Sequence, residues 1–191
     1  MPIVQQWANS LAPGIFLDAG SGTGLYRPVL ENAGHSVISV DISPDMLKIQ
    51  RDHYPHATLI GADVCALPFP ARHFDYILCT RVLSHVASLD KAFSEFARVA
   101  KHDARMLITD IHSEHHYTDM SVPVDGKRVS IETHKHSVAE LKRAISPPLE
   151  LITLDEYRLD DVPWKPPLEN FENIYNSPGN PIFYIAILRC I

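Results

Sequence analysis

Long apolar runs, basic stretches and paired cysteines are all missing from this sequence. No apolar segment approaches the roughly 20 residues that a membrane-spanning helix needs. The N-terminus has no basic region followed by a long apolar run, so we expect no secretory signal. Basic residues form neither a run nor a stripe, and the formal net charge is −6 at pH 7, which disfavours nucleic acid as a ligand. We therefore expect a cytoplasmic protein that binds neither membranes nor nucleic acid.

Cysteine is scarce, and its placement supports the same expectation. Cys65, Cys79 and Cys190 lie far apart in apolar surroundings, which is typical of reduced, buried thiols in the cytoplasm. A nearby positive charge such as Arg81 is one way to make a thiol reactive, but we expect inert buried thiols here. The composition, 46% hydrophobic and 21% charged, fits one globular domain over residues 1–191.

Apolar segments of strand length alternate with amphipathic segments of helical spacing through the first two thirds of the chain. This alternation is typical of an α/β protein with a parallel sheet. The expected strands cover residues 15–18, 35–40, 58–60, 74–79, 105–109, 149–158 and 182–189. Expected helices cover residues 26–33 and the segment from Leu89 to Ala100. A further helix is expected to start at Ser43, which caps it, with Pro44 in its first position. The last expected helix starts with a capping box at Ser137 and Glu140 and ends at Ile145.

The strongest chemical signal is a glycine-rich turn between the first expected strand and the first expected helix, Leu17-Asp18-Ala19-Gly20-Ser21-Gly22-Thr23-Gly24. Glycines let a ligand approach the backbone closely and permit positive φ. A dinucleotide-binding turn needs a third glycine, and Leu25 or Arg27 stands there, depending on which pair of glycines is counted from. Asp18 would also repel phosphates, whereas it suits a ligand that carries an ammonium group.

Two further carboxylates follow at strand ends. Asp41 closes the second expected strand, where a carboxylate can accept hydrogen bonds from both hydroxyls of a ribose. Asp63 comes just after the third expected strand and can accept a hydrogen bond from an exocyclic amine such as that of adenine. Together with Asp18, these residues predict a crevice for a nucleoside with a positively charged tail.

In these segments the sequence resembles the class I S-adenosylmethionine (SAM)-dependent methyltransferases, in the small-molecule branch that includes the ubiquinone/menaquinone-type methyltransferases. The resemblance covers residues 14–111. It rests on the glycine turn followed, in order, by segments 40–47, 62–69, 74–77, 82–86 and 95–99. It implies a Rossmann-like, doubly wound α/β fold with a seven-stranded sheet, mostly parallel with a reversed last strand.

The resemblance also implies how SAM is bound. The glycine turn would face the methionine part, the end of the second strand would hold the ribose, the end of the third would bracket the adenine, and the end of the fourth would offer backbone to the amino-acid end. The implied cofactor-binding residues are Asp18, Gly20, Ser21, Gly22, Asp41, Ile42, Met46, Asp63, Val64 and Thr80.

The expected function is transfer of a methyl group from the sulfonium of SAM to a nucleophile on a small molecule, either a secondary metabolite or a quinone-like ring. Positioning supplies most of the rate, because SAM is already reactive. One alternative is a SAM-binding partner or regulatory subunit that transfers no methyl. A more distant one is a NAD-dependent dehydrogenase, which Leu25 and Asp18 disfavour.

Histidine, with 11 residues, supplies the catalytic candidates. His112 follows the fifth expected strand, at the end where ligands bind in such sheets, and neutral imidazole is the usual general base near neutral pH. His85, after the fourth expected strand, is the second candidate. His115 and His116 could join His112 at a zinc ion, but no second ligand cluster has fitting spacing, so we expect no metal. Alternatively, these histidines belong to a solvated loop.

Cover for the site is expected from an insertion. Alternation from Ser121 to Thr133 around Asp125-Gly126 predicts a β-hairpin within an insertion at about 113–136, and we expect it to act as a lid. The family usually has one or two covering helices before the glycine turn, whereas segment 1–13 is short. We therefore also expect a second copy or a partner subunit to cover the site.

Two smaller features complete the prediction. Lys101-His102-Asp103-Ala104 replaces the family's usual lysine-proline-glycine-glycine turn, which we interpret as a surface variation. Tyr117, Phe171 and Tyr175 either line a substrate pocket or only pack, and the sequence leaves both readings open.

Overall fold

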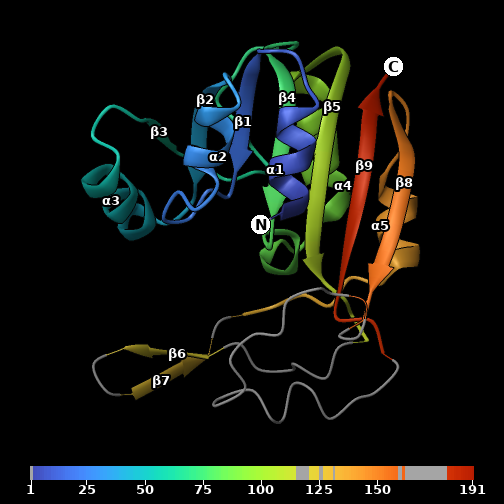
Figure 1. Ribbon diagram of the computed structural model, residues 1–191. Helices are drawn as coiled ribbons and strands as arrows, with labels where there is room; N and C mark the ends of the chain where they lie inside the picture. Colours follow the sequence, from blue (N-terminus) through green and yellow to red (C-terminus); the bar gives the residue numbers. More distant parts are fainter. Residues whose placement is uncertain (1, 115–120, 125–126, 131, 159–160, 162–179) are drawn as a thin grey trace.

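A seven-stranded sheet forms the centre of the computed structural model, which describes residues 2–114, 121–124, 127–130, 132–158, 161 and 180–191 (Figure 1). The strand order is β3-β2-β1-β4-β5-β9-β8. The strands are β1 (Ile15–Ala19), β2 (Ser36–Asp41), β3 (Thr58–Gly61), β4 (Phe74–Thr80), β5 (Ala100–Ile111), β8 (Leu149–Tyr157) and β9 (Phe183–Cys190). Pairing is parallel from β3 to β5, and β9 is antiparallel to both β5 and β8. This confirms the predicted mostly parallel sheet with a reversed last strand.

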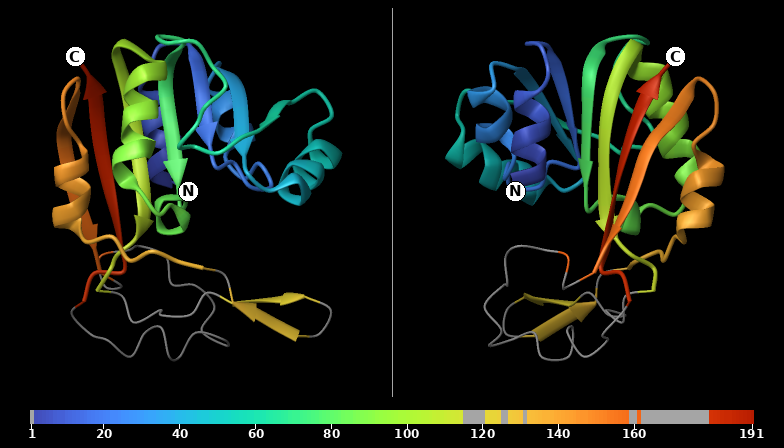
Figure 2. Two further views of the ribbon diagram at one scale, coloured as in Figure 1. Left: turned by 180° about the vertical axis from the view of Figure 1, so that it is seen from behind. Right: turned by 45° about the vertical axis from the view of Figure 1, so that its right-hand side comes forward.

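Helices cover both faces of the sheet, as a doubly wound fold requires (Figure 2). They are α1 (Pro2–Asn9), α2 (Arg27–Asn32), α3 (Pro44–His53), the 3₁₀ turn η1 (Leu83–His85), α4 (Leu89–Val99) and α5 (Val138–Ala144). None of the helices in the described ranges is long and apolar enough to cross a membrane.

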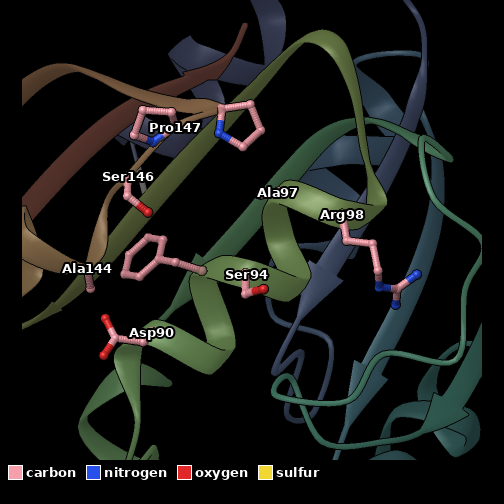
Figure 3. A pocket seen from close by; sticks show the side chains of 9 residues that line it. Asp90, Ser94, Ala97, Arg98, Ala144, Ser146 and Pro147 are labelled. Carbon is pink, nitrogen blue, oxygen red and sulfur yellow. The ribbon is translucent and has the colours of Figure 1, made fainter.

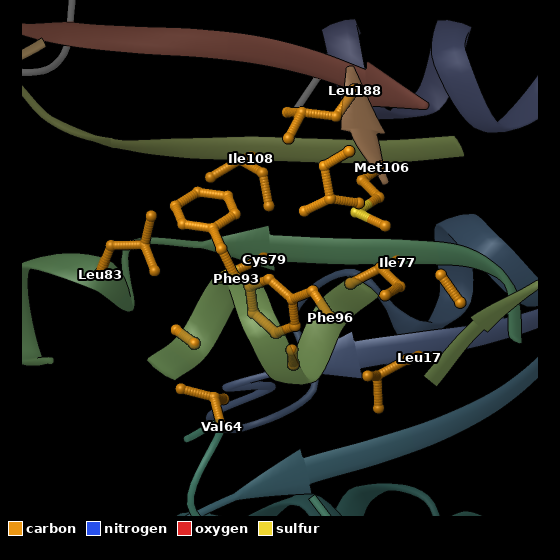
Figure 4. Packing of buried hydrophobic residues seen from close by; sticks show 14 of the residues in the cluster. Leu17, Val64, Ile77, Cys79, Leu83, Phe93, Phe96, Met106, Ile108 and Leu188 are labelled. Atoms are coloured by element: carbon orange, nitrogen blue, oxygen red, sulfur yellow. The ribbon is translucent and has the colours of Figure 1, made fainter. Parts of the chain in front are cut away.

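Successive strand residues point to opposite faces of the sheet, so their side chains pack into two separate hydrophobic cores. In β4, Ile77 belongs to the core beneath α4, whereas Leu78 belongs to the core beneath α1. Phe93 and Phe96 of α4 fill the first core at ring centroids 6.0 Å apart, against Ile77 (Figure 4). Val4 is one of the two buried residues of α1 in the second core. Burying both faces explains why the central strands read as continuous apolar runs.

Helix starts follow the predicted capping chemistry. The Ser43 hydroxyl accepts the N–H of Met46 at 3.4 Å, with Pro44 in the first turn of α3. The predicted capping box of α5 is present, since Ser137 accepts the N–H of Glu140 and the Glu140 carboxylate accepts the N–H of Ser137 at 2.8 Å. These side chains satisfy N–H groups that have no partner inside a helix.

The fifth strand differs from its prediction. It begins at Ala100, directly after α4, and runs to Ile111 instead of covering only 105–109. Its partner in β4 changes from Phe74 at Ala100 to Tyr76 at Arg105, so residues 101–104 form a bulge. Asp103 takes a left-handed φ of +63° there, a conformation that aspartate adopts more readily than most residues. The bulge stands where the family's glycine-containing turn was expected.

The predicted hairpin is present as β6 (Ser121–Val124) and β7 (Lys127–Ser130), which pair antiparallel. It lies beyond the carboxyl ends of the parallel strands (Figure 1). Its turn residues 125–126 lie outside the described residues, as do 115–120. The lid role of the hairpin stays a prediction.

Candidate functional site

The strand order changes direction at one point of the sheet. The chain moves outward from β1 to β2 and β3, then returns to place β4 on the other side of β1. In open α/β sheets, ligands bind at the carboxyl ends of the strands at such a switch point. The segments that follow β1, β2, β3 and β4 therefore define the candidate site.

Backbone hydrogen bonds and tight packing shape the glycine turn. The N–H groups of Gly20 and Ser21 donate to the carbonyl of Val40 at 2.8 and 2.9 Å. Gly20 has φ +70°, and a Cβ there would lie 2.1 Å from Cγ2 of Val82. Gly22 has φ +55°, yet no described atom lies within 4 Å of where its Cβ would stand. The turn is thus packed against the end of β4 at Gly20 and open at Gly22.

Asp41 connects this turn to α3. Its Oδ2 accepts the N–H of Gly22 at 2.7 Å, and its Oδ1 accepts the N–H of Ser43 at 2.9 Å. Each carboxylate oxygen retains a lone pair for another donor. The carboxylate predicted to bind ribose is therefore held in place by backbone before any ligand arrives.

Apolar surface continues from this carboxylate. Ile42 is 72% exposed and Met46 is 41% exposed, whereas Val64 is buried. Asp63 uses Oδ1 to accept the N–H of Cys65 at 2.8 Å. Burial and the negative charge of Asp63 raise the pKa of Cys65 to about 11, so this thiol is not a nucleophile near neutral pH. Exposed aliphatic side chains next to a fixed carboxylate suit a flat, uncharged ring.

Asp18 is the most unusual polar residue of the site. It is 1% exposed, and its Oδ2 is a buried oxygen without a hydrogen-bond partner among the described residues. Burial raises its pKa to about 7, the charge of Arg27 lowers it, and the charge of Asp41 raises it. A buried carboxylate oxygen with no donor is costly.

Two supporting side chains were missed by the sequence analysis. Gln50 is fully buried, accepts the hydroxyl of Ser21 at 2.8 Å and donates to the hydroxyl of Ser39 at 3.0 Å. Arg27 is buried as well and donates to Ser39 at 2.9 Å and to the carbonyl of Val37 at 3.2 Å. The Ser21 side chain therefore faces α3 and supports the turn. Arg27 and Gln50 are polar residues at helix positions that face the sheet, and this was the signal that the sequence offered for them.

The end of β5 carries a fourth carboxylate that was also missed. Asp110 is buried, and its Oδ2 accepts the N–H of Ser84 at 2.8 Å while its Oδ1 accepts the N–H of Ile111 at 2.7 Å. It therefore fixes η1, which follows β4, onto β5. Its signal in the sequence was a single acidic residue inside an apolar strand.

The two predicted catalytic histidines lie in different environments. His112 is buried; its Nδ1 accepts the N–H of Glu114 at 3.2 Å, and its Nε2 lies 3.2 Å from Oε1 of Glu156. This pattern places the ring proton on Nε2, where it donates to Glu156. His85 is exposed on η1, with Nδ1 3.4 Å from the carbonyl of Glu132. His115, His116, Tyr117, Phe171 and Tyr175 lie outside the described residues.

A separate cavity of about 330 Å³ lies between α4 and the turn after α5 (Figure 3). Asp90 and Ser94 of α4 lie on one side of it and Ser146 and Pro147 on the other. Its lining residues come from neither the glycine turn nor the ends of β1 to β3. It is therefore distinct from the candidate site at the switch point.

Comparison with known proteins agrees with the geometry. Residues 17–108 match the family described as "Methyltransferase domain". The demethylmenaquinone methyltransferase of Renibacterium salmoninarum is 32% identical over 94 residues, which cover 49% of this chain and 40% of that protein. The chain thus matches less than half the length of this curated relative.

Solved structures share the fold over nearly the whole chain. A geranyl diphosphate C-methyltransferase from Streptomyces coelicolor, solved with S-adenosyl-L-homocysteine, aligns with a TM-score of 0.78 at 16% identity, covering 99% of this chain and 79% of that one. The [4+2]-cyclase SpnF aligns with a TM-score of 0.73 at 14% identity, covering 98% of this chain and 80% of that one. The domain match over residues 17–108 and the motifs in order confirm the resemblance of this part of the chain to the class I SAM-dependent methyltransferases, and the solved structures confirm the fold.

Proposed function

We propose that this protein transfers the methyl group of SAM to a small-molecule acceptor. The observation that carries this proposal is the buried Oδ2 of Asp18, which has no partner among the described residues, at the start of a glycine turn that is open at Gly22. A cationic donor would satisfy the carboxylate, and the open face leaves room for the ligand backbone to approach.

The candidate site offers a matching group for each part of SAM. Asp18 would accept the ammonium of the methionine part, and Asp41, fixed by two backbone N–H groups, would accept the ribose hydroxyls. Ile42 and Met46 offer exposed aliphatic surface to the adenine ring, and Asp63 would accept from its amine. The residues present therefore fit the cofactor.

Bound SAM supplies an electrophilic methyl group on a sulfonium. The residues of the chain bind, orient and exclude water, and positioning of this kind can supply much of the rate. His112 lies at the end of β5, and its Nδ1 would accept a proton from the acceptor once the N–H of Glu114 moves away. Glu156 would hold the ring proton on Nε2 in that step.

A small acceptor fits the charge of the protein. The formal net charge is −6 and the basic residues are dispersed, so the electrostatic footprint of a nucleic-acid-binding surface is missing from the sequence. The related protein of Renibacterium salmoninarum is named after demethylmenaquinone, which contains a quinone ring. We propose a quinone-like ring or a comparable metabolite, with the β6–β7 hairpin as a lid and a second copy or partner subunit over the remaining opening.

The second candidate is a SAM-binding protein that transfers no methyl. It is favoured by one observation: a solved structure with the same fold is a [4+2]-cyclase. Methyl transfer to any acceptor in a screen with radiolabelled SAM would decide against this candidate.

Calorimetry with SAM, S-adenosylhomocysteine and NAD tests the proposed cofactor. We expect the two adenosyl ligands to bind with micromolar affinity, about −8 kcal/mol, and NAD not to bind. Binding of NAD alone would overturn the proposal.

A further inference from the structure

Arg81 occupies an unusual backbone position directly after β4. It has φ +57°, a left-handed conformation that non-glycine residues rarely adopt. Its N–H donates to the carbonyl of Thr109 at 2.7 Å, which fixes the residue between β4 and β5. This strained residue lies at the switch point of the sheet. Backbone strain of this kind clusters at functional sites, which suggests that the Arg81 side chain has a function there.

The two neighbours of Arg81 show where it lies. Val82 packs so closely on the glycine turn that a Cβ on Gly20 would lie 2.1 Å from its Cγ2. Thr80, on the other side, is the last residue of β4, and β4 pairs with β1 so that Asp18 lies opposite Leu78. Arg81 therefore lies at the end of the strand that neighbours Asp18, beside the residue that packs on the glycine turn.

The side chain of Tyr26 is affected by one positive and one negative side chain, Arg81 and Asp18. Burial raises the pKa of Tyr26, the positive charge of Arg81 lowers it, and the negative charge of Asp18 raises it. The phenol thus lies within electrostatic reach of both charges. Arg81 is exposed, and its guanidinium has no hydrogen bond or ion pair within the described part of the chain. One end of the glycine turn accordingly presents a buried anion and an unpaired cation.

The other arginine near the turn is already engaged. Arg27 is 1% exposed and pairs with Glu31 at 2.6 Å, besides its hydrogen bonds to β2. Its guanidinium is therefore already hydrogen-bonded and holds α2 against the sheet. Arg81 is the better placed of the two to receive an anionic group from solvent.

We infer that Arg81 binds the α-carboxylate of the methionine part of SAM, while Asp18 accepts the ammonium on the same carbon. This inference rests on the proposed function. A zwitterionic amino acid needs one anion and one cation a short distance apart, and Asp18 on β1 and Arg81 just after the neighbouring strand β4 supply them. Guanidinium suits this task because its fork of donors matches a carboxylate. An anionic acceptor could present a carboxylate too, but the close packing of the neighbouring Val82 on Gly20 favours the cofactor.

Calorimetry without acceptor tests this inference with Arg81→Gln. The probes are SAM, decarboxylated SAM, which keeps the ammonium, and 5′-methylthioadenosine, which lacks the whole amino-acid end. We expect Arg81→Gln to weaken SAM binding about tenfold or more, the scale of hydrogen bonds to a charged group. The affinities for decarboxylated SAM and for 5′-methylthioadenosine should not change.

Arg72→Gln is the matched control. Arg72 is also exposed and has a left-handed φ of +56°, but it precedes β4 at the opposite end of the strand. We expect it to leave all three affinities unchanged. Arg81→Lys should recover part of the SAM affinity, and thermal unfolding should show that both Arg81 variants are folded.

Each other outcome has a distinct meaning. Equal weakening of SAM and decarboxylated SAM would make Arg81 a structural residue and overturn the inference. Unchanged SAM affinity with a raised KM for an acceptor would assign Arg81 to the acceptor and also overturn it. Failure of the unmodified protein to bind any of the three probes would instead overturn the proposed function.

Discussion

The two halves of the sheet hold their polar groups in different ways. At β1 and β2, Asp41 receives N–H groups from Ser43, two positions away, and from Gly22, nineteen positions away. At β5, His112 meets Glu156 at a separation of 44 positions, and Asp110 receives the N–H of a residue 26 positions away. Asp41, in the half expected to bind the cofactor, is held by residues nearer in the sequence than are the partners of His112 and the Ser84 partner of Asp110, in the half expected to receive the acceptor. Changes in the first half should therefore affect binding, and changes in the second should affect turnover.

The largest effect is expected from His112→Gln, which tests the acceptor half. Loss of a general base typically lowers turnover by about 10²–10⁴-fold. We expect this loss with SAM affinity unchanged, measured as initial rates at saturating SAM once an acceptor is known. Glu156→Gln should lower turnover less, because the imidazole itself remains.

His56→Gln is the control for that measurement, since His56 is an exposed histidine that pairs with Glu31 far from β5. If His112→Gln retained turnover within about twofold of the unmodified protein, far below the usual range for a lost base, His112 would be a loop residue and His85 the next candidate.

Gly20→Ala tests how tightly the cofactor half is packed. The new Cβ would meet Val82 at 2.1 Å on a backbone with φ +70°. Overpacking and backbone strain together should lower the free energy of unfolding by about 2–4 kcal/mol. We expect SAM binding to be lost as well. Urea denaturation and calorimetry measure the two effects.

Gly22→Ala separates strain from packing. Gly22 has φ +55° but open space around it, so only the strain of about 1 kcal/mol should appear in the free energy of unfolding. Equal destabilisation by both alanines would show that contact with Val82 is not the cause.

Asp41→Ala tests whether the local motif binds the ribose. Loss of hydrogen bonds to a charged group should weaken SAM binding by about 1.5–3 kcal/mol. The matched control is Asp45→Ala, because Asp45 is exposed in the first turn of α3, close to the same site. A folded Asp41→Ala protein with unchanged SAM affinity would show that the ribose is bound elsewhere.

The pH dependence of stability, compared between the unmodified protein and Asp18→Asn, tests the cost of burying the Asp18 carboxylate. The pKa of Asp18 is about 7 in the folded protein and 3.8 in a model peptide. The folded state therefore keeps a proton that the unfolded chain gives up between these values. The resulting stability is complete below pH 3.8 and is lost as the pH rises through about 7.

Compared with Asp18→Asn, the unmodified protein should lose about 1.4 kcal/mol or more of its free energy of unfolding across this window, the equivalent of one pKa unit. Chemical denaturation of both proteins at several pH values measures the difference. A pH-independent difference would mean that Asp18 titrates like an ordinary aspartate.

The parts of the fold that the sequence predicted are those with local causes. The strands of the first half were predicted almost to the residue; for β1 and β4 the reason is that burial on both faces produces nearly continuous apolar runs. The helix starts at Ser43 and Ser137 were correct because capping is decided within a few residues. The start of β5 was wrong, because its bulge depends on pairing with β4 and not on its own residues.

The site shows the same division. The sequence predicted the order of strands and helices, the glycine turn and the carboxylates that follow β1, β2 and β3, since each depends on residues close together in the chain. Only the tertiary structure decided that Oδ2 of Asp18 has no donor among the described residues, that Gln50 holds Ser21 and that the end of β4, with Arg81, lies beside the glycine turn. The physical reason is that burial, charge proximity and missing hydrogen-bond partners exist only once distant strands have come together.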